Sequence, residues 1–113
     1  FGQPIGQFQL IQGMLADMKT EWYAGRSMVL DAAVRKDDGE NIQTASSCCK
    51  YFCTEMVGRV ADRAVQIFGG AGYIADYGIE RFYRDVRIFR LYEGTSQIQQ
   101  LIIARNMLRE LDG

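Results

Sequence analysis

The sequence has 113 residues, 48% of them hydrophobic, which suffices for one domain with a core of its own but leaves no room for a second. Thirteen basic and 14 acidic residues give a formal net charge of −1, so no overall field favours nucleic acid or an anionic membrane. No apolar run approaches the ~20 residues that span a bilayer, and the first residues lack the regions of a signal peptide. We therefore expect a soluble protein with no membrane span and no nucleic-acid partner, and the start at Phe1 predicts a piece cut from a longer protein.

Apolar residues recur every three to four positions over residues 8–35, which predicts a long amphipathic first helix. Turn formers and charges at 37–41 end this helix, and a second periodic run covers 43–68. A shorter helix is predicted at 79–87, followed by an irregular piece and a last helix at 96–111. With no alternating strand pattern and only short connections, the predicted fold is all-α, an antiparallel (up-and-down) four-helix bundle.

The same periodicity predicts which side chains face the core, because residues three and four apart share one face of a helix. Helical spacing also leads us to interpret several large side chains as core or subunit interface rather than as a cofactor site, namely Trp22, Tyr23, Met14, Met18 and Met28. In the first helix the predicted stripe is Ile11, Leu15, Met18, Trp22, Val29 and Ala33. In the last helix it is Ile98, Leu101, Ile102 and Leu108.

The chain has three cysteines and no histidine. Cys48, Cys49 and Cys53 lie in the second predicted helix with no spacing that fits a zinc site, so we predict no metal and a reduced intracellular setting. Cys49 and Cys53 are one helical turn apart and are better explained as small core residues than as ligands. The lack of histidine excludes Ser-His and Cys-His nucleophiles, so an acid–base role falls to Glu, Asp, Lys or Tyr.

One acidic residue, Glu93, stands in the break before the last helix, within the run LYEGTSQIQ at 91–99. Tyr92 and the apolar helix that follows would shield its carboxylate from water. Desolvation disfavours the charged form of a carboxyl group, and this is how a glutamate is tuned for proton abstraction. The alternative is a plain electrostatic role, since acidic residues are favoured at helix N-termini. The position of Glu93 alone leaves both open.

The glycines after the second helix formally satisfy a dinucleotide-binding fingerprint, GAGYIA at 70–75. That fingerprint needs a preceding strand, and a helical pattern stands there instead, so no Rossmann site is predicted. Gly69 is instead predicted to cap the helix in the left-handed conformation.

Ser96 and Gln99 form the pattern S-x-x-Q, which predicts a capping box at the start of the last helix. Exposed N–H groups at a helix start also attract phosphate and carbonyl oxygens, so Thr95 and Gln97 are candidates for contacts with a nucleotide. A basic stripe precedes this segment, but interleaved acidic residues predict internal ion pairs rather than phosphate or nucleic-acid binding. The stripe comprises Arg81, Arg84, Arg87 and Arg90.

Three segments, in order across nearly the whole chain, resemble the acyl-CoA dehydrogenase family of flavoproteins. Residues 79–107, IERFYRDVRIFRLYEGTSQIQQLIIARNM, are similar to its C-terminal signature, and QIFGGAGY at 66–73 looks like its glycine motif. FGQPI at 1–5, with Phe8 and Gln9, looks like the start of its C-terminal domain. The resemblance implies that residues 1–113 are the C-terminal helical domain, without the N-terminal helical and middle β domains of the family.

The resemblance implies roles for single residues. Glu93 would be the catalytic base that removes the α-proton of an acyl-CoA thioester while the β-hydride passes to the flavin, which yields the trans-2-enoyl-CoA. Tyr92 and Gly94 would contact the substrate, and the backbone N–H of Glu93 would bind the thioester oxygen together with a ribityl hydroxyl of the flavin. The implied FAD contacts are Gln66, Gly69, Gly70, Thr95, Gln97, Phe1 and Gln9, with the glycine motif reaching the FAD of a neighbouring subunit.

The resemblance also implies FAD as the cofactor, a role in fatty acid β-oxidation, electron-transfer flavoprotein as the electron acceptor, and a homodimer or homotetramer. The implied location is the bacterial cytoplasm or the mitochondrial matrix. Ala71 departs from the Asn of many members but leaves the glycine turn intact. Two alternatives stay open, a non-catalytic helical oligomerisation module and an acyl-CoA oxidase. Because the other domains supply much of the flavin and acyl pocket, the isolated 113 residues are predicted to be inactive.

Overall fold

The computed structural model describes residues 1–113 and contains helices but no strand, which confirms the all-α prediction. The four main helices lie close to the predicted ranges. They are α1 (Gln9–Asp37), α2 (Gln43–Phe68), α4 (Ile79–Val86) and α5 (Ser96–Asp112). The shorter helical segments are η1 (Ile5–Gln7), α3 (Gly70–Tyr73), η2 (Ala75–Tyr77) and η3 (Arg87–Arg90).

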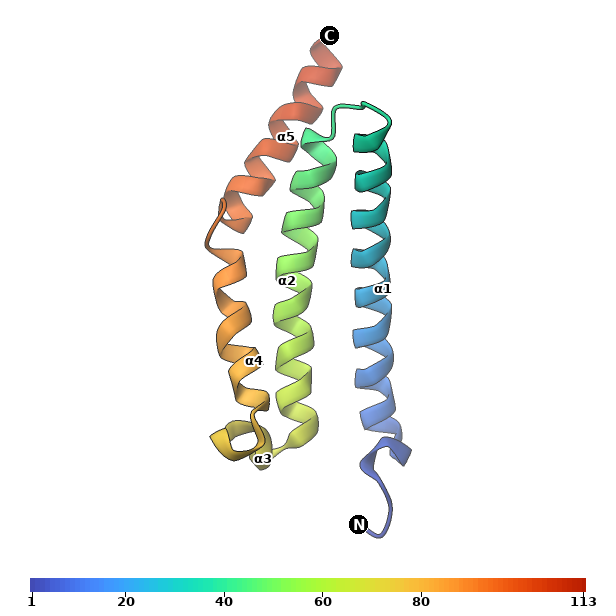
Figure 1. Cartoon of the computed structure of the whole chain (residues 1–113), viewed down its shortest axis with the longest axis vertical. Helices are drawn as coiled ribbons and strands as arrows, with labels where there is room; N and C mark the ends of the chain where they lie inside the picture. Colours follow the sequence, from blue (N-terminus) through green and yellow to red (C-terminus); the bar gives the residue numbers. More distant parts are fainter.

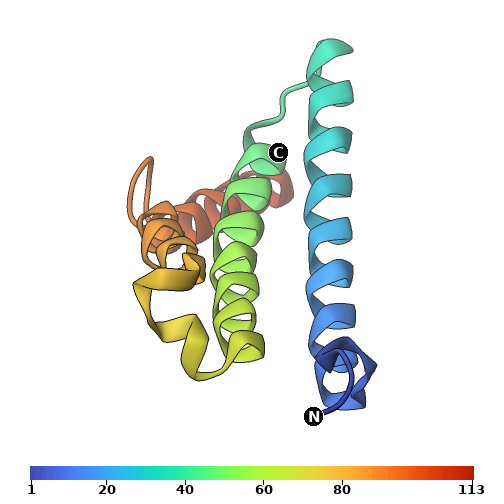
Figure 2. The ribbon, with the colours of Figure 1, turned by 60° about the horizontal axis from the view of Figure 1, so that its bottom comes forward.

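α2 runs antiparallel to α1 and to the α4–α5 segment, in which α4 and α5 run in the same direction (Figure 1). α1 packs on one side of α2, while α4 and α5 follow one another along the other side. Figure 2 shows α2 between α1 and the α4–α5 side. The arrangement is the predicted up-and-down bundle, in which α4 and α5 together form the third column.

The bundle is elongated and has little interior. Its extents are 63 × 25 × 24 Å and its radius of gyration is 17.7 Å, whereas a compact chain of this length has a radius of about 13 Å. Eight of the 113 residues are buried, and the buried apolar ones are Ala32, Met56 and Ala61. The expectation of a core of its own is therefore wrong. The helices cover one another mainly along their contacts with α2, so most large apolar side chains stay partly exposed.

α1 packs on α2 through a face offset from the predicted stripe. Gly25 is buried there, and a Cβ atom at this position would stand 3.0 Å from the Cε of Met56. Leu15, Trp22 and Val29 of the predicted α1 stripe are 45%, 45% and 47% exposed, so they do not form a core within this chain. Ile98, Leu101 and Leu108 of the predicted α5 stripe are likewise exposed in this chain. Apolar residues surround much of each helix, so their spacing alone does not select the buried face.

Glycines end α2, but not in the predicted way. Gly69 has φ 62° and ψ −142°, a region open to glycine that differs from the left-handed helical conformation. The next residues form α3, which packs back against α2. Gly72 permits this close approach, because a Cβ atom there would lie 2.5 Å from the carbonyl oxygen of Val65.

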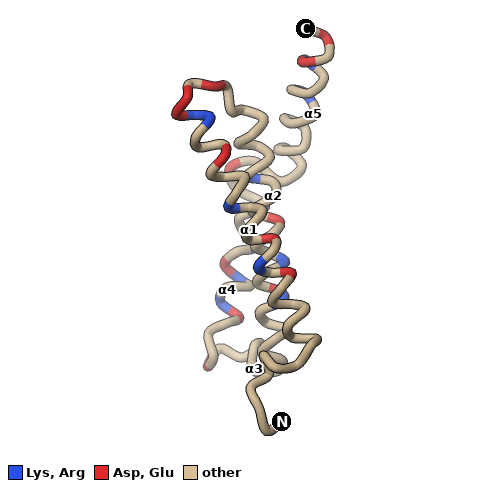
Figure 3. Tube along the Cα trace, turned by 90° about the vertical axis from the view of Figure 1, so that its right-hand side faces the viewer, with Lys and Arg blue, Asp and Glu red and all other residues tan.

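Ion pairs connect both sides of the bundle to α2, and Figure 3 shows charges of both signs distributed along the helices. Glu21 of α1 pairs with Arg59 (3.0 Å) and Arg63 (2.6 Å) of α2. Burial raises the pKa of Glu21, but the hydrogen bonds and charges of the two arginines outweigh it and leave the pKa below its ordinary value. On the other side, Arg90 pairs with Glu55 of α2 (3.5 Å). The predicted internal pairing is wrong for Arg81, Arg84 and Arg87, which form no ion pair.

The three cysteines are free thiols, and each of them is partly buried. Burial raises the pKa of the Cys49 thiol, with smaller effects of the neighbouring cysteines and Asp31, and burial also raises the pKa of Cys53. The Sγ of Cys53 lies 3.7 Å from the carbonyl oxygen of Gly25, so this side chain packs between α1 and α2. No group of three His, Cys, Asp or Glu residues is placed to hold a metal ion. No helix combines the length and the apolar character needed to cross a membrane.

Candidate active site

The break before α5 holds Glu93 in an uncommon backbone conformation. Its φ is 54°, the only positive φ of a non-glycine residue in the chain, and Gly94 follows with φ 85°. A left-handed conformation costs a non-glycine residue about 1–2 kcal/mol. Such strain persists only where the surrounding structure enforces it, and it is concentrated at active sites. The backbone therefore distinguishes Glu93 from an acidic residue that merely stands near a helix start.

Two polar side chains hold the backbone of this break. Gln99 of α5 is 7% exposed and donates from Nε2 to the carbonyl oxygen of Glu93 (3.1 Å). Lys50 of α2 donates from Nζ to the carbonyl oxygen of Gly94 (2.5 Å). A Cβ atom on residue 94 would lie 2.8 Å from the Nε2 of Gln99. Position 94 therefore requires glycine both for its φ and for the space that Gln99 occupies.

Glu55 of α2 connects the two ends of the break. Its Oε1 accepts a hydrogen bond from the Oγ of Ser96 (2.6 Å), and its Oε2 pairs with the Nη1 of Arg90 (3.5 Å). Arg90 closes η3 and Ser96 opens α5, so a single carboxylate bridges the segments that flank Glu93. Sequence reasoning missed both Glu55 and Lys50, since they lie in a helix far upstream and no spacing signals the contact.

α5 is capped one residue earlier than predicted. Thr95 is the N-cap, and its Oγ1 accepts from the N–H of Ile98 (3.2 Å). The predicted capping box of Ser96 and Gln99 is wrong, because these side chains bond to Glu55 and Glu93 instead. The backbone N–H groups of Ser96 and Gln97 have no acceptor within the chain. Free donors at the start of a long helix suit a phosphate or carbonyl oxygen.

The side chain of Glu93 is exposed in this chain. Tyr92 is itself 47% exposed and stacks on Phe89, with ring centroids 5.7 Å apart. The predicted shielding of the carboxylate by Tyr92 and the last helix is therefore wrong for this chain alone. The backbone N–H of Glu93 also has no acceptor here. Both polar groups of Glu93 are thus available to a molecule outside the chain.

The residues predicted to bind cofactor or substrate form two separate groups. Tyr92, Gly94, Thr95 and Gln97 adjoin Glu93 in sequence. The second group lies at the far end of α2 and near the N-terminus, and it comprises Gln66, Gly69, Gly70, Phe1 and Gln9. Gln66 lies in the same helix as Lys50, which contacts Gly94. At a rise of 1.5 Å per helical residue, these two positions are about 24 Å apart. An open cavity of about 670 Å³ brings Phe1 and Gln9 beside Ile67. The chain does not bring the two groups together.

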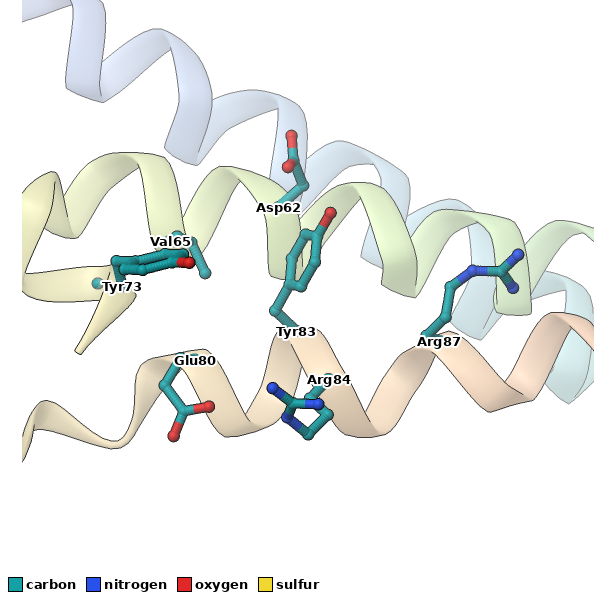
Figure 4. A pocket seen from close by; sticks show the side chains of 8 residues that line it. Asp62, Val65, Tyr73, Glu80, Tyr83, Arg84 and Arg87 are labelled. Atoms are coloured by element: carbon teal, nitrogen blue, oxygen red, sulfur yellow. The ribbon is translucent and has the colours of Figure 1, made fainter. Parts of the chain in front are cut away.

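A cavity of about 750 Å³ between α2, α3 and α4 contains none of the predicted site residues (Figure 4). Its charged lining consists of Asp62 from α2, Glu80 and Arg84 from α4, and Arg87 from η3, so two carboxylates balance two guanidinium groups. Neither strained backbone nor a network of hydrogen bonds is found there. The geometry therefore places the candidate active site at Glu93 rather than in this cavity.

Comparison with known proteins gives the family. The family described as "Acyl-CoA dehydrogenase, C-terminal domain" matches residues 1–108. The chain belongs to the acyl-CoA dehydrogenase family. This confirms the resemblance, and the match covers all three segments on which it rested.

Several known proteins are similar to this chain in sequence or in fold. The CarC subunit of a caffeyl-CoA reductase-Etf complex from Acetobacterium woodii is 43% identical over 97% of this chain and 29% of CarC. The structure of butyryl-CoA dehydrogenase from Megasphaera elsdenii gives a TM-score of 0.91 at 38% identity, over 96% of this chain and 28% of that one. The structure of an FAD complex of PigA gives a TM-score of 0.90 at 32% identity, over 100% of this chain and 29% of PigA. The chain thus spans less than a third of the length of these relatives.

Proposed function

We propose that this chain is the C-terminal helical domain of an FAD-dependent acyl-CoA dehydrogenase. Glu93 is its catalytic base for the α,β-dehydrogenation of an acyl-CoA thioester to the trans-2-enoyl-CoA. The observation that carries the proposal is the strained backbone of Glu93, held from both sides by Gln99 and Lys50 while the carboxylate stays exposed. A carboxylate held in this way is ready for a partner outside the chain, and the chain has no histidine to act as base instead.

The chain's own groups supply two parts of this reaction. The carboxylate of Glu93 removes the α-proton of the thioester. Its backbone N–H, which has no acceptor in the chain, donates to the thioester oxygen and stabilises the charge that develops there. Bound FAD would accept the β-hydrogen with its electron pair. Substrate and the other domains of the protein would exclude water from Glu93, which this chain alone leaves exposed.

Two parts of the chain fit FAD as the cofactor. Thr95 and Gln97 flank the free N–H groups at the start of α5, which suit a flavin oxygen. Gly69 and Gly70 are exposed and have open space where side chains would stand, so a large ligand can approach their backbone. The two groups are far apart, which agrees with a glycine motif that serves the FAD of a neighbouring subunit. The structure of PigA with FAD supports the same cofactor.

The proposed dehydrogenase activity implies a substrate, an electron acceptor and an oligomeric partner. The substrate is an acyl-CoA, and electron-transfer flavoprotein is the electron acceptor, as the Etf complex named for CarC supports. Exposed apolar side chains on α1 and α5 support a homodimer or homotetramer built through this domain. The bacterial relatives favour the cytoplasm over the mitochondrial matrix. The pathway proposed is fatty acid β-oxidation.

A reductase is the second candidate, because CarC is named as a reductase subunit. The same Glu93 would then return a proton to the α-carbon of an enoyl-CoA. An acyl-CoA oxidase also uses the same base and differs in letting oxygen reach the reduced flavin. The remaining alternative is a helical oligomerisation module in which Glu93 has no chemical role.

The test is anaerobic bleaching of the flavin in the full-length protein by a panel of acyl-CoAs. Wild type is compared with Glu93→Gln, and with Glu110→Gln as the matched control, since Glu110 is exposed and forms no ion pair. We expect rapid bleaching in the wild type and the control, and a loss of several orders of magnitude in Glu93→Gln with FAD still bound.

Other outcomes separate the alternatives. Equal bleaching in Glu93→Gln and wild type would move the base elsewhere. Bleached flavin that is reoxidised by air as fast as the enzyme turns over would indicate an oxidase. Reoxidation of chemically reduced flavin by an enoyl-CoA, without bleaching by any acyl-CoA, would favour the reductase. No reaction with any substrate would favour the oligomerisation module.

A further inference from the structure

The strained conformation of Glu93 needs support from outside its own segment. A left-handed backbone is unfavourable for a residue with a Cβ atom, so the free segment would relax to another conformation. Neither Glu93 nor Gly94 lies within a helix, and their carbonyl oxygens accept from side chains rather than from the backbone. The supporting atoms are the Nε2 of Gln99 and the Nζ of Lys50.

We propose that Lys50 and Gln99 are positioning residues that hold the carboxylate of Glu93 in place for proton abstraction. The proposal rests on the proposed function of Glu93 as the base. Gln99 fixes the residue that carries the carboxylate, and Lys50 fixes the peptide that follows. Neither side chain needs to touch the substrate, since each acts on a backbone oxygen of the break.

Lys50 supplies the stronger of the two contacts. Its ammonium group stands 2.5 Å from the carbonyl oxygen of Gly94, and hydrogen bonds from a charged donor are stronger than neutral ones. Lys50 has no ion pair with a carboxylate that would compete for this donor. Because it projects from α2, the contact ties the break to the helix at the centre of the bundle.

Gln99 acts through its burial as well as its hydrogen bond. It is 7% exposed, so its amide cannot exchange its acceptor for bulk water without cost. It also fills the space beside Gly94, where a Cβ atom would stand 2.8 Å away. The amide therefore packs against the turn whose carbonyl oxygen it binds, which leaves the backbone of Glu93 little freedom.

Glu55 of α2 also supports the break that contains Glu93. It holds Ser96 on one side of the break and Arg90 on the other, so the two ends of the segment cannot move apart independently. Lys50 and Glu55 are both residues of α2, which makes one helix the frame for the whole break. A base that is misplaced by about 1 Å loses on the order of 100-fold in rate. Loss of either positioning residue is expected to cost an amount of this size.

The experiment is single-turnover reduction of the flavin in the full-length protein, measured anaerobically with its preferred acyl-CoA and with the same substrate deuterated at Cα. The variants are Lys50→Met, Lys50→Arg and Gln99→Glu, in which an oxygen replaces the donating Nε2. Lys36→Met and Gln100→Glu are the matched controls, since Lys36 forms no ion pair and Gln100 is exposed and bonds to Tyr51. FAD content and substrate dissociation constant are measured for each variant.

We expect Lys50→Met and Gln99→Glu to lower the limiting rate of reduction by about 100-fold, with FAD content and substrate affinity unchanged. The deuterium isotope effect should persist or rise, because the slowed step is removal of the α-proton. Lys50→Arg keeps a charged donor, so its limiting rate of reduction should be about tenfold higher than that of Lys50→Met. The controls should match the wild type. Lys50→Gln and Gln99→Met replace any variant that does not fold, with the same expectation.

Two results would overturn the positioning role. One is a limiting rate within about twofold of wild type in both Lys50→Met and Gln99→Glu. The other is a loss of FAD and substrate affinity in parallel with the rate, which a purely structural role would produce. Glu93→Gln, measured alongside, keeps the two proposals distinct. If that variant is as fast as wild type, the base assignment fails. If Glu93→Gln is inactive while the Lys50 and Gln99 variants reduce the flavin within about twofold of the wild-type rate, only the positioning role fails.

Discussion

Replacement of Gly94 by alanine combines two costs that can be separated. The φ of 85° costs an alanine about 1–2 kcal/mol. The new Cβ atom would also stand 2.8 Å from the Nε2 of Gln99 and displace it from the carbonyl oxygen of Glu93. Leaving a buried amide and its acceptor unpaired costs about 1–3 kcal/mol more. We expect Gly94→Ala to destabilise the folded protein by about 2–5 kcal/mol in total.

Gly39→Ala is the matched control, because Gly39 has nearly the same φ, 82°, and open space around its Cβ position. It should carry the backbone cost alone. The assay is thermal unfolding of the full-length protein at a fixed FAD concentration, with flavin reduction by acyl-CoA as a second readout. We expect the midpoint shift of Gly94→Ala to be about twice that of Gly39→Ala or larger, and only Gly94→Ala to slow reduction. Equal shifts would show that contact with Gln99 costs nothing and would refute the reasoning.

Four further outcomes are expected. Thr95→Ala removes the N-cap of α5 and should cost about 0.5–2 kcal/mol in thermal unfolding, and no change in midpoint would contradict the cap. The pKa of Glu21 lies below its ordinary value of 4.5, so its contribution to stability is present above that pH and is lost as pH falls through the folded pKa. Wild type and Glu21→Gln should therefore converge in stability under acid titration, and a constant difference would argue against the ion pairs. Because burial raises the pKa of both thiols, Cys49 and Cys53 should react slowly with iodoacetamide at neutral pH in the folded protein and rapidly after denaturation. The isolated 113 residues should be inactive and should not bind FAD stoichiometrically, as flavin absorbance after gel filtration would show.

The helix ranges could be predicted because periodicity and helix breakers are local signals. Gly69 ends α2 and the charged turn after Asp37 ends α1, close to where the sequence placed these ends. The buried face of α1 could not be predicted in the same way. Leu15 and Trp22 fit the spacing of an amphipathic helix as well as the residues that face α2 do. Only the position of α2 decides which of the two sets is buried.

The candidate site shows the same division between local and distant information. The place of Glu93 in a short break before a helix, together with the family resemblance, makes it a candidate base. The predicted cap of α5 lies one residue too late, because Thr95 and Ser96 both carry a hydroxyl group. What decides between them is Glu55, which engages Ser96 from another helix. Lys50 carries no local signal at all, since its partner lies 44 residues away.

The hydrogen bond from Lys50 to Gly94 also bears on the order in which the protein folds. Helices form from contacts within a few residues, whereas this bond closes a loop of 44 residues and must wait for α5 to dock on α2. The backbone of Glu93 can reach its left-handed state only after that docking, because nothing within its own segment supports it. During refolding, we therefore expect most helical structure to form before the backbone of Glu93 reaches its left-handed conformation, which would be among the last parts of the chain to be fixed.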